Sequence, residues 1–174
     1  DEVLIGPAME AFEKMLNPSF GDRPPDTTEE NIQARSRGLA LMALSNKTGD
    51  MVVSTGNKSE MSVGYATLYG DMCGGYSVLK DIYKTAVFAL SRWRNEHRPD
   101  GALGPQGAVI PERIITKPPS AELKPDQTDQ DTLPPYDQLD FILTCLNEKD
   151  MGVDATVEKG YDRPTVLRVW RMLL

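Results

Sequence analysis

The sequence is poor in the residue types on which several classes of enzyme and binding protein depend. It has two cysteines, Cys73 and Cys145, and one histidine, His97, in 174 residues. Two cysteines are too few for a disulfide framework or a zinc site, and we expect both to be reduced thiols in a cytoplasmic protein. The histidine lies in the polar segment 94–100, which we expect to be a solvated helix end. Ser-His-Asp and Cys-His catalysis are therefore excluded.

The sequence also lacks a long apolar run and an excess of basic residues. No apolar segment approaches the roughly 20 residues that a membrane-spanning helix needs, so we expect no membrane segment. The net charge is −7 and the isoelectric point is about 4.8. A protein that binds a nucleic-acid backbone needs a basic surface, so we expect no nucleic-acid partner. A small anionic ligand is compatible with this charge, because a few lysines and helix N-termini can make a local positive pocket.

The sequence also has no glycine-rich phosphate loop of the GxGxxG or GxxxxGK[ST] kind. Its most informative segment for function is 51–71. A β-branched run at 51–54 predicts a strand. It is followed by Thr55, Gly56, Asn57, Lys58, Ser59 and Glu60. Glycine and polar side chains directly after a strand are typical of a ligand site at the carboxyl end of a strand. Hydroxyl, amide, ammonium and carboxylate groups together suit a nucleotide phosphate and a divalent cation.

The remaining pattern predicts mostly helices in a chain long enough for one domain. A capping box of Thr27 and Glu30 is expected to open a helix to about residue 44, with Leu41 and Leu44 buried. Asp154 and Asp162 are expected N-caps. The expected helices are 8–16, 27–44, 77–95, a short one in 111–115, one over 136–146, 155–160 and 163–173. Only two strands are expected, at 1–5 and 51–54, so further strands lie either in apparent loops or outside this chain.

Six ordered blocks of the sequence carry a resemblance to a known family. They are residues 28–38, 41–50, 54–72, 80–95, 110–123 and 129–143. In order and spacing they resemble the carboxyl-terminal part of an NAD synthetase, and the forms TLYGD and LPPYDQLD are more similar to its glutamine-dependent branch than to its ammonia-fed branch. Six blocks over most of the chain are far more specific than one short motif.

The resemblance implies a fold, a reaction and partners. The fold would be α/β, a three-layer Rossmann-like sheet of the adenine-nucleotide α-hydrolase type, truncated and helix-rich in this chain. The reaction would be the ATP-dependent amidation of deamido-NAD to NAD through an adenylated intermediate. Ammonia would come from glutamine, through a glutaminase domain of the same polypeptide. Magnesium would be the metal, ATP a co-substrate, and the protein a homodimer or a higher homo-oligomer.

Four positions match residues of the family that bind ATP and magnesium. By this resemblance Glu60 is the magnesium ligand, and Thr55, Lys84 and Ser120 contact ATP. Each has a simpler local interpretation: Glu60 as a solvated helix-start glutamate, Lys84 as a surface lysine, and the two hydroxyls as caps. A carboxylate beside nucleotide phosphates suits magnesium, which takes few protein ligands and keeps substrate oxygens.

Other positions match residues that bind deamido-NAD or act near the incoming ammonia. The deamido-NAD residues implied by the resemblance are Asn31, Arg35, Glu60, Tyr65, Ala66, Thr67 and Leu68. Asn31 and Arg35 are four apart on one helix and share a face. At Leu68 the ammonia-fed branch has a lysine, so this chain departs from that pattern. Asp71 matches a catalytic carboxylate that can hold and orient ammonium, and its local alternative is a turn aspartate.

The family's pyrophosphate-binding loop, of the form SGGxDS, does not occur in the sequence. We therefore expect residues 1–174 to be a partial NAD synthetase domain, the ammonia ligase part. Two alternatives remain open: another ATP-pyrophosphatase ligase, or a non-catalytic dimerisation and assembly part of the same enzyme.

This gives the first prediction: the 174 residues by themselves do not convert deamido-NAD, ATP and ammonia into NAD. The reason is that the loop that would hold the pyrophosphate is absent from them. Incubating the purified chain with the three substrates and assaying NAD tests this directly. Turnover above the background of a mock purification would contradict it.

Overall fold

The structure, a computed structural model, describes residues 2–173, which fold as two compact units. The first unit contains the chain up to Gly56, Tyr65–Lys80 and Leu123–Pro125. The second contains Asn57–Gly64, Asp81–Glu122 and the chain from Asp126 on. The chain therefore passes between the units several times, and each unit is assembled from separate segments.

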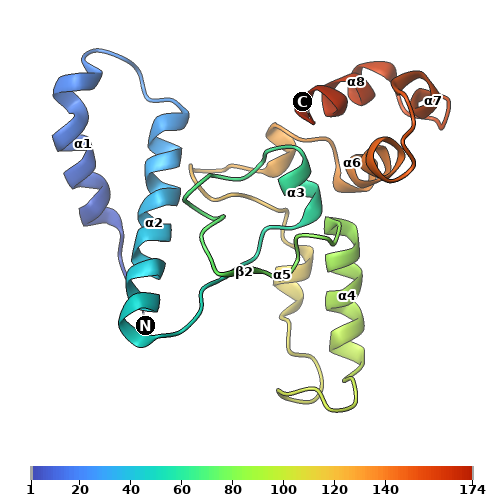
Figure 1. Ribbon diagram of the computed structural model, residues 1–174, viewed down its shortest axis with the longest axis horizontal. Coiled ribbons are helices and arrows are strands. Elements are labelled where there is room, and N and C mark those ends of the chain that lie inside the picture. The colour runs from blue at the N-terminus through green and yellow to red at the C-terminus, as the bar shows by residue number, and fades with distance from the viewer. Residues whose placement is uncertain (1, 174) are drawn as a thin grey trace. The chain divides into compact units, whose positions relative to one another are not determined.

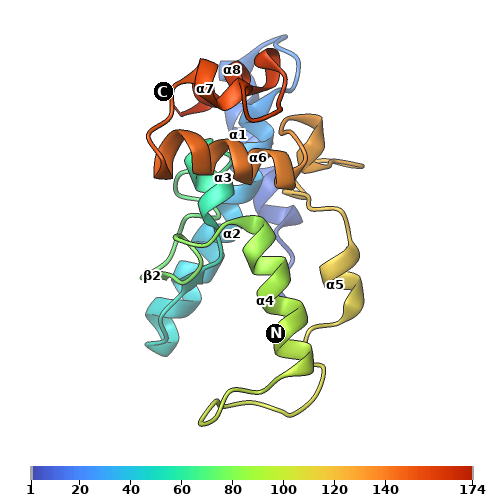
Figure 2. The same cartoon turned by 90° about the vertical axis from the view of Figure 1, so that its right-hand side faces the viewer.

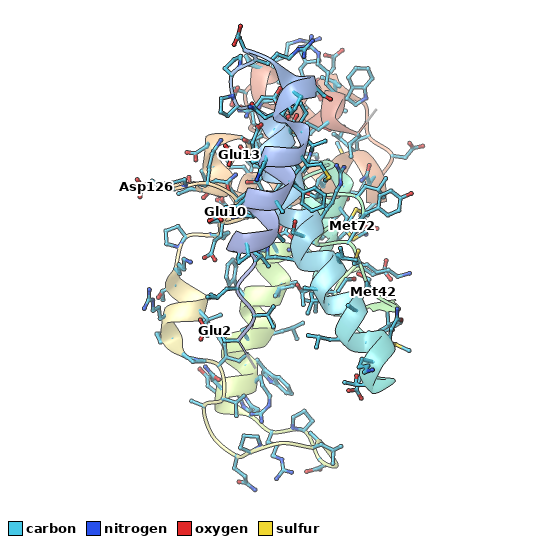
Figure 3. The ribbon with its side chains drawn as sticks, turned by 90° about the vertical axis from the view of Figure 1, so that its left-hand side faces the viewer. Glu2, Glu10, Glu13, Met42, Met72 and Asp126 are labelled. Atoms are coloured by element: carbon cyan, nitrogen blue, oxygen red, sulfur yellow. The ribbon has the colours of Figure 1, made fainter. Side chains whose placement is uncertain are left out.

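Two long helices, α1 (Gly6–Phe20) and α2 (Thr27–Thr48), lie side by side in the first unit (Figure 1). Figure 3 shows Glu10 and Glu13 along α1, both exposed. The helix expected at 8–16 is confirmed but is longer, because it continues through Pro18, and Gly21 closes it by donating its N–H to the Asn17 carbonyl.

Helix α2 is confirmed with two corrections. Its N-cap is Asp26, whose carboxylate accepts from the Thr28 N–H at 2.7 Å. The Asp26 N–H donates in turn to the Glu29 carboxylate at 2.7 Å, which completes the capping box. The expected box of Thr27 and Glu30 was therefore one residue late, because an aspartate precedes the two threonines and caps as well as they do. Leu41 and Leu44, expected to be buried, are 49% and 44% exposed in this chain.

A two-strand parallel sheet belongs to the first unit. Strand β1 (Val53–Ser54) pairs with β2 (Tyr76–Ser77), with Val53 opposite Tyr76. The strand expected at 51–54 is confirmed in its second half, and β2 was missed. The strand expected at 1–5 is wrong for the described residues 2–5, because Ile5 is the N-cap of α1. Asp1 lies outside the described residues.

Small residues allow α2 to approach the segment 65–73 closely within the first unit. A Cβ on Gly38 would lie 2.9 Å from the Tyr69 carbonyl oxygen and 3.0 Å from that of Gly70. A Cβ on Gly70 would lie 2.9 Å from the Ala34 Cβ. Tyr69 itself has a φ of 64°, a backbone conformation that is rare for a bulky residue. The turn at 69–70 is therefore shaped by contact with the helix.

The second unit is helical, and its core lies around α6 and α8. Its elements are α3 (Lys58–Ser62), α4 (Lys84–Glu96), α5 (Glu112–Thr116), the 3₁₀ turn η1 (Asp129–Asp131), α6 (Tyr136–Leu143), the π-helical turn η2 (Thr144–Glu148), α7 (Val153–Val157) and α8 (Arg163–Met172). Figure 2 shows α6 passing next to α3 and the start of α4. The side chains of Leu139, Ile142, Leu143, Val166 and Val169 are fully buried.

Several expectations for this unit change. The helix expected at 77–95 begins only at Lys84, because β2 uses residues 76–77 and the Ile82 carbonyl accepts from the Lys58 N–H at 2.9 Å. Leu90 and Trp93, two of the apolar residues that recur at helical spacing in this segment, are 49% and 45% exposed. Asp162 caps α8 as expected, whereas the N-cap of α7 is Gly152 and Asp154 lies in its first turn.

His97 ends α4 as expected, where its ring stacks on Trp93. No helix among residues 2–173 combines the length and apolar character that crossing a membrane requires.

A charged cluster joins α3 to the π-helical turn η2. The Lys58 ammonium pairs with the Glu148 carboxylate and lies 4.9 Å from the centre of the Tyr83 ring, while the Tyr83 hydroxyl donates to Glu148 at 3.2 Å. The hydrogen bond from Lys58 lowers the pKa of Glu148 and raises the pKa of Lys58. Burial raises the pKa of the Tyr83 hydroxyl.

The close approach of α2 predicts that Gly38→Ala destabilises the protein by about 1–3 kcal/mol. A new Cβ must displace backbone oxygens rather than a flexible side chain, and this outweighs the gain of about 1 kcal/mol that alanine brings to a helix. Gly6→Ala is the control, because a Cβ there meets nothing within 4 Å in helix α1. Chemical denaturation measures both; equal stabilities of the two variants would contradict the prediction.

The Lys58 pair predicts a dependence of stability on pH. Because the pKa of Glu148 is lowered by folding, its stabilising contribution is full above the unfolded-state value of about 4.3 and is lost as the pH falls through the folded value. Glu148→Gln should therefore be less stable than wild type at neutral pH, and the difference should shrink as the pH falls below about 4. Denaturation curves across this range measure the difference.

Glu158→Gln serves as the control for this comparison. It removes the same charge from an exposed position in the second unit that has no lysine partner among the described residues. A pH-independent difference between wild type and Glu148→Gln would show that the ion pair is not its source.

Candidate functional site

The polar cluster after β1 forms the start of α3 and carries Glu60. The Asn57 side chain accepts from the Glu60 N–H at 3.1 Å, and the Glu60 carboxylate faces the Asn57 N–H, so the two residues form a capping box. The other oxygen of Glu60 pairs with the Lys84 ammonium at 2.7 Å. The two side chains are only 18% and 19% exposed. Glu60 is therefore not the freely solvated glutamate of the simpler interpretation.

Lys84 is the first residue of α4, and that helix is capped by other elements. Its own N-cap residue, Tyr83, makes no side-chain cap. The Lys84 N–H donates instead to the Ser59 hydroxyl at 2.8 Å, and the Thr85 N–H donates to the Asp140 carboxylate at 2.9 Å. The Thr85 hydroxyl also donates to Asp140, at 2.7 Å, and the Ser59 hydroxyl donates to its other oxygen. Asp140 is 5% exposed.

Two aromatic rings also lie near the Lys84 ammonium. It lies 5.3 Å from the centre of the Tyr136 ring and 5.9 Å from that of Phe88, within the range of a cation–π interaction. The Tyr136 hydroxyl donates to the buried Asp129 carboxylate at 2.6 Å. In the second unit, Glu60 and Lys84 thus share a partly enclosed, strongly polar site at the starts of two helices.

The first unit brings together another group of the expected residues. The Arg35 side chain on α2 donates from Nε to the Leu68 carbonyl at 3.1 Å. The Asp71 carboxylate accepts from the Thr67 N–H at 2.7 Å, and the side chain of Asp71 is exposed. The segment 65–71 is therefore a tight turn held against α2. The Leu68 carbonyl accepts from one N–H of Arg35, and the other guanidinium N–H groups are not used in this bond.

The remaining expected residues have weaker structural support. Thr55 is exposed and is not an N-cap, because Asn57 caps α3. Ser120 is half-buried, and its hydroxyl accepts from the Glu122 N–H at 3.1 Å, as in a local turn. Asn31 and Tyr65 are half-buried in the first unit.

A magnesium ion would find one suitable carboxylate at this site. No group of three or more metal-binding side chains that could hold a metal ion occurs among residues 2–173. Magnesium is commonly bound by one or two carboxylates together with substrate phosphates, so Glu60 fits as a single protein ligand. The adjacent Lys84 ammonium also fits such an arrangement, because it can contact the same phosphates as a point charge.

Four residues of this site were not predicted from the sequence: Thr85, Asp129, Tyr136 and Asp140. Ser59 was predicted only as a member of the polar cluster after the strand. One signal was available: Asp140 interrupts the otherwise apolar run 139–143, between Leu139 and Phe141. Charged residues are almost never fully buried unless they are paired, so an aspartate on an apolar helix face indicates a fixed partner. The identity of that partner could not be obtained from the local pattern.

Comparison with known proteins gives the chain a family. The model of the NAD synthase family matches residues 1–174. The glutamine-dependent NAD(+) synthetase of Acinetobacter baylyi is 54% identical over 169 residues, which cover 97% of this chain and 30% of that protein. That of Rhodobacter capsulatus is 55% identical over 174 residues, covering 99% and 31%. The chain spans about 30% of the length of these curated relatives.

Solved structures agree with this assignment. A glutamine-dependent NAD+ synthetase from Acinetobacter baumannii in complex with ADP has a TM-score of 0.59 and 47% identity, over 97% of this chain and 28% of that chain. An NMN synthetase from Francisella tularensis has a TM-score of 0.73 and 26% identity, over 98% and 59%. The resemblance found in the sequence is confirmed. The chain belongs to the NAD synthase family.

Proposed function

We propose that this chain is the ligase part of a glutamine-dependent NAD(+) synthetase and amidates deamido-NAD at the expense of ATP. The observation that carries the proposal is the Glu60–Lys84 pair at 2.7 Å, placed at the starts of two helices. Helix N-termini favour anions, and a lysine beside a carboxylate can bind a phosphate and its magnesium ion. The names of the relatives that are 54% and 55% identical support the same reaction.

The proposed chemistry activates a carboxylate that is otherwise a poor electrophile. The nicotinate carboxylate of deamido-NAD attacks the α-phosphorus of ATP, and pyrophosphate leaves. Ammonia then attacks the acyl carbon of the adenylate, loses a proton, and displaces AMP. Lys84 binds phosphate oxygens in this scheme, and Glu60 would hold magnesium, which supplies charge neutralisation at the phosphates when bound. Thr55 and Ser120 are proposed further contacts with ATP.

The dinucleotide is proposed to bind to residues of the first unit. Arg35 has donors left for a phosphate after its bond to the Leu68 carbonyl, and an arginine fork suits two phosphate oxygens. Asn31, Tyr65, Ala66, Thr67 and Leu68 are the other proposed contacts there, and Glu60 is a separate proposed contact. Asp71 is the proposed catalytic carboxylate, because it is exposed and can accept a hydrogen bond from ammonium.

The proposal extends to the finer fold and the partners. The two-strand parallel sheet is proposed to be part of a three-layer sheet of the adenine-nucleotide α-hydrolase type. Ammonia is proposed to come from glutamine through a glutaminase domain of the same polypeptide, and the protein to form a homo-oligomer.

Lys84→Met tests the proposed function. In the complete gene product that carries these residues, we expect the KM for ATP to rise about 10- to 100-fold, because a charged hydrogen bond to phosphate contributes roughly 1.5–3 kcal/mol. Release of pyrophosphate in the presence of deamido-NAD and ammonium measures this. Lys14→Met is the control, since Lys14 is exposed on α1 in the first unit.

Equal KM values for ATP in the two lysine variants would contradict the assignment of Lys84. Replacing deamido-NAD by nicotinate mononucleotide tests the substrate, because one structural relative is an NMN synthetase. A higher kcat/KM for the mononucleotide than for the dinucleotide would overturn the proposed substrate while leaving the ATP site in place.

A further inference from the structure

We propose that helix α6 positions Lys84: Asp140 fixes the backbone around Lys84, and the ring of Tyr136 holds the Lys84 ammonium in place. The proposal rests on the proposed function, because it assumes that Lys84 binds ATP. Tyr136 and Asp140 are four residues apart on α6 and so share one face of the helix. Both are buried, at 7% and 5% exposure.

Asp140 acts on the backbone around both charged residues. One oxygen accepts from the N–H and the hydroxyl of Thr85, next to Lys84. The other accepts from the Ser59 hydroxyl, next to Glu60, and that hydroxyl in turn accepts from the Lys84 N–H. One carboxylate therefore ties together the two helix starts from which Glu60 and Lys84 project. Losing it would change the separation of the two side chains without touching either.

Tyr136 acts on the ammonium group. Its ring lies 5.3 Å from Nζ of Lys84 and its hydroxyl donates to Asp129, which is 2% exposed. The ring can therefore not turn away from Lys84 without breaking a hydrogen bond to a buried carboxylate, which is costly. A lysine side chain has many rotamers, and a fixed aromatic surface reduces how many it visits before the ligand binds.

The placement of Lys84 also needs electrostatic support. It is the first residue of α4, where the helix dipole disfavours a cation. The Asp140 carboxylate accepts from the Thr85 N–H at the start of α4, and the Glu60 carboxylate accepts from the Lys84 ammonium. They offset the dipole and hold the ammonium in place. An anionic ligand there meets the lysine, the ring and the helix start already assembled.

A pair of substitutions at Tyr136 separates positioning from simple packing. Tyr136→Phe and Tyr136→Leu both remove the hydroxyl that bonds Asp129, so both lose that stabilisation. Only Tyr136→Leu also removes the ring. In the complete gene product, we expect the KM for ATP to rise roughly three- to thirtyfold for Tyr136→Leu, the range of a cation–π contact, and to rise less for Tyr136→Phe, which keeps the ring but frees it from Asp129. The KM for deamido-NAD should be unchanged in both.

Asp140→Asn tests the backbone role, because the amide cannot accept from Ser59 and Thr85 in the same way. We expect the KM for ATP to rise about tenfold or more. In a Lys84→Met background the same substitution should add little, since the lysine it positions is gone. Thr85→Val is a milder variant that removes one hydroxyl bond to Asp140 and is used if Asp140→Asn does not fold. Thr48→Val, on α2, is its matched control.

The outcomes distinguish this proposal from the one it rests on. If Lys84→Met raises the KM for ATP but Tyr136→Leu and the Asp140 or Thr85 variant do not, the positioning role is overturned and the ATP-binding role stands. If Lys84→Met has no effect on that KM, the proposed function of Lys84 fails first. Equal increases in the KM values for ATP and deamido-NAD, together with a lower Tm, would assign α6 a structural role only and overturn the positioning role.

Discussion

The buried carboxylate of Asp140 is the interaction on which the helical second unit depends. It lies on an apolar helix, and a buried charge without hydrogen bonds would cost several kcal/mol. Its donors come from Ser59 on α3 and Thr85 on α4. The starts of these two short segments have no strand pairing to hold them, because the two strands of the described chain belong to the first unit. The need to satisfy one charge therefore helps to set where α4 begins and ties that start to α3.

This constraint explains an arrangement that would otherwise be unfavourable. Glu60 at the third position of α3 is favoured by the helix dipole and by its capping box with Asn57, whereas Lys84 at the first position of α4 is disfavoured. The lysine is kept there by carboxylates and by aromatic rings. A fold that holds a cation at the positive end of a helix concentrates groups that attract anions, which is the requirement of a site for nucleotide phosphates.

The sequence predicted elements whose signals are local and missed those that depend on distant contacts. Helices α1, α2, α5, α6 and α8 follow from apolar periodicity and caps such as Asp162, and α3 begins within the polar cluster that the sequence singled out. Strand β2 is two residues long, too short for an alternating pattern. The helix expected from residue 77 starts at Lys84 because its first N–H groups are capped by Ser59 and Asp140, and no window around residue 84 contains that information.

The same distinction applies to the candidate site. Glu60 and Lys84 could each be assigned by resemblance, yet their meeting depends on Asp140, which is 81 residues from Ser59 along the chain. In the first unit, the contact of Arg35 with Leu68 likewise depends on Gly38 and Gly70, whose lack of side chains lets the turn approach α2. Charged and glycine residues that break an apolar or helical pattern therefore mark the positions where distant segments are fixed to each other. Because the groups that would contact a ligand lie beside these positions, the residues that violate local preferences are the ones that determine the geometry of the site.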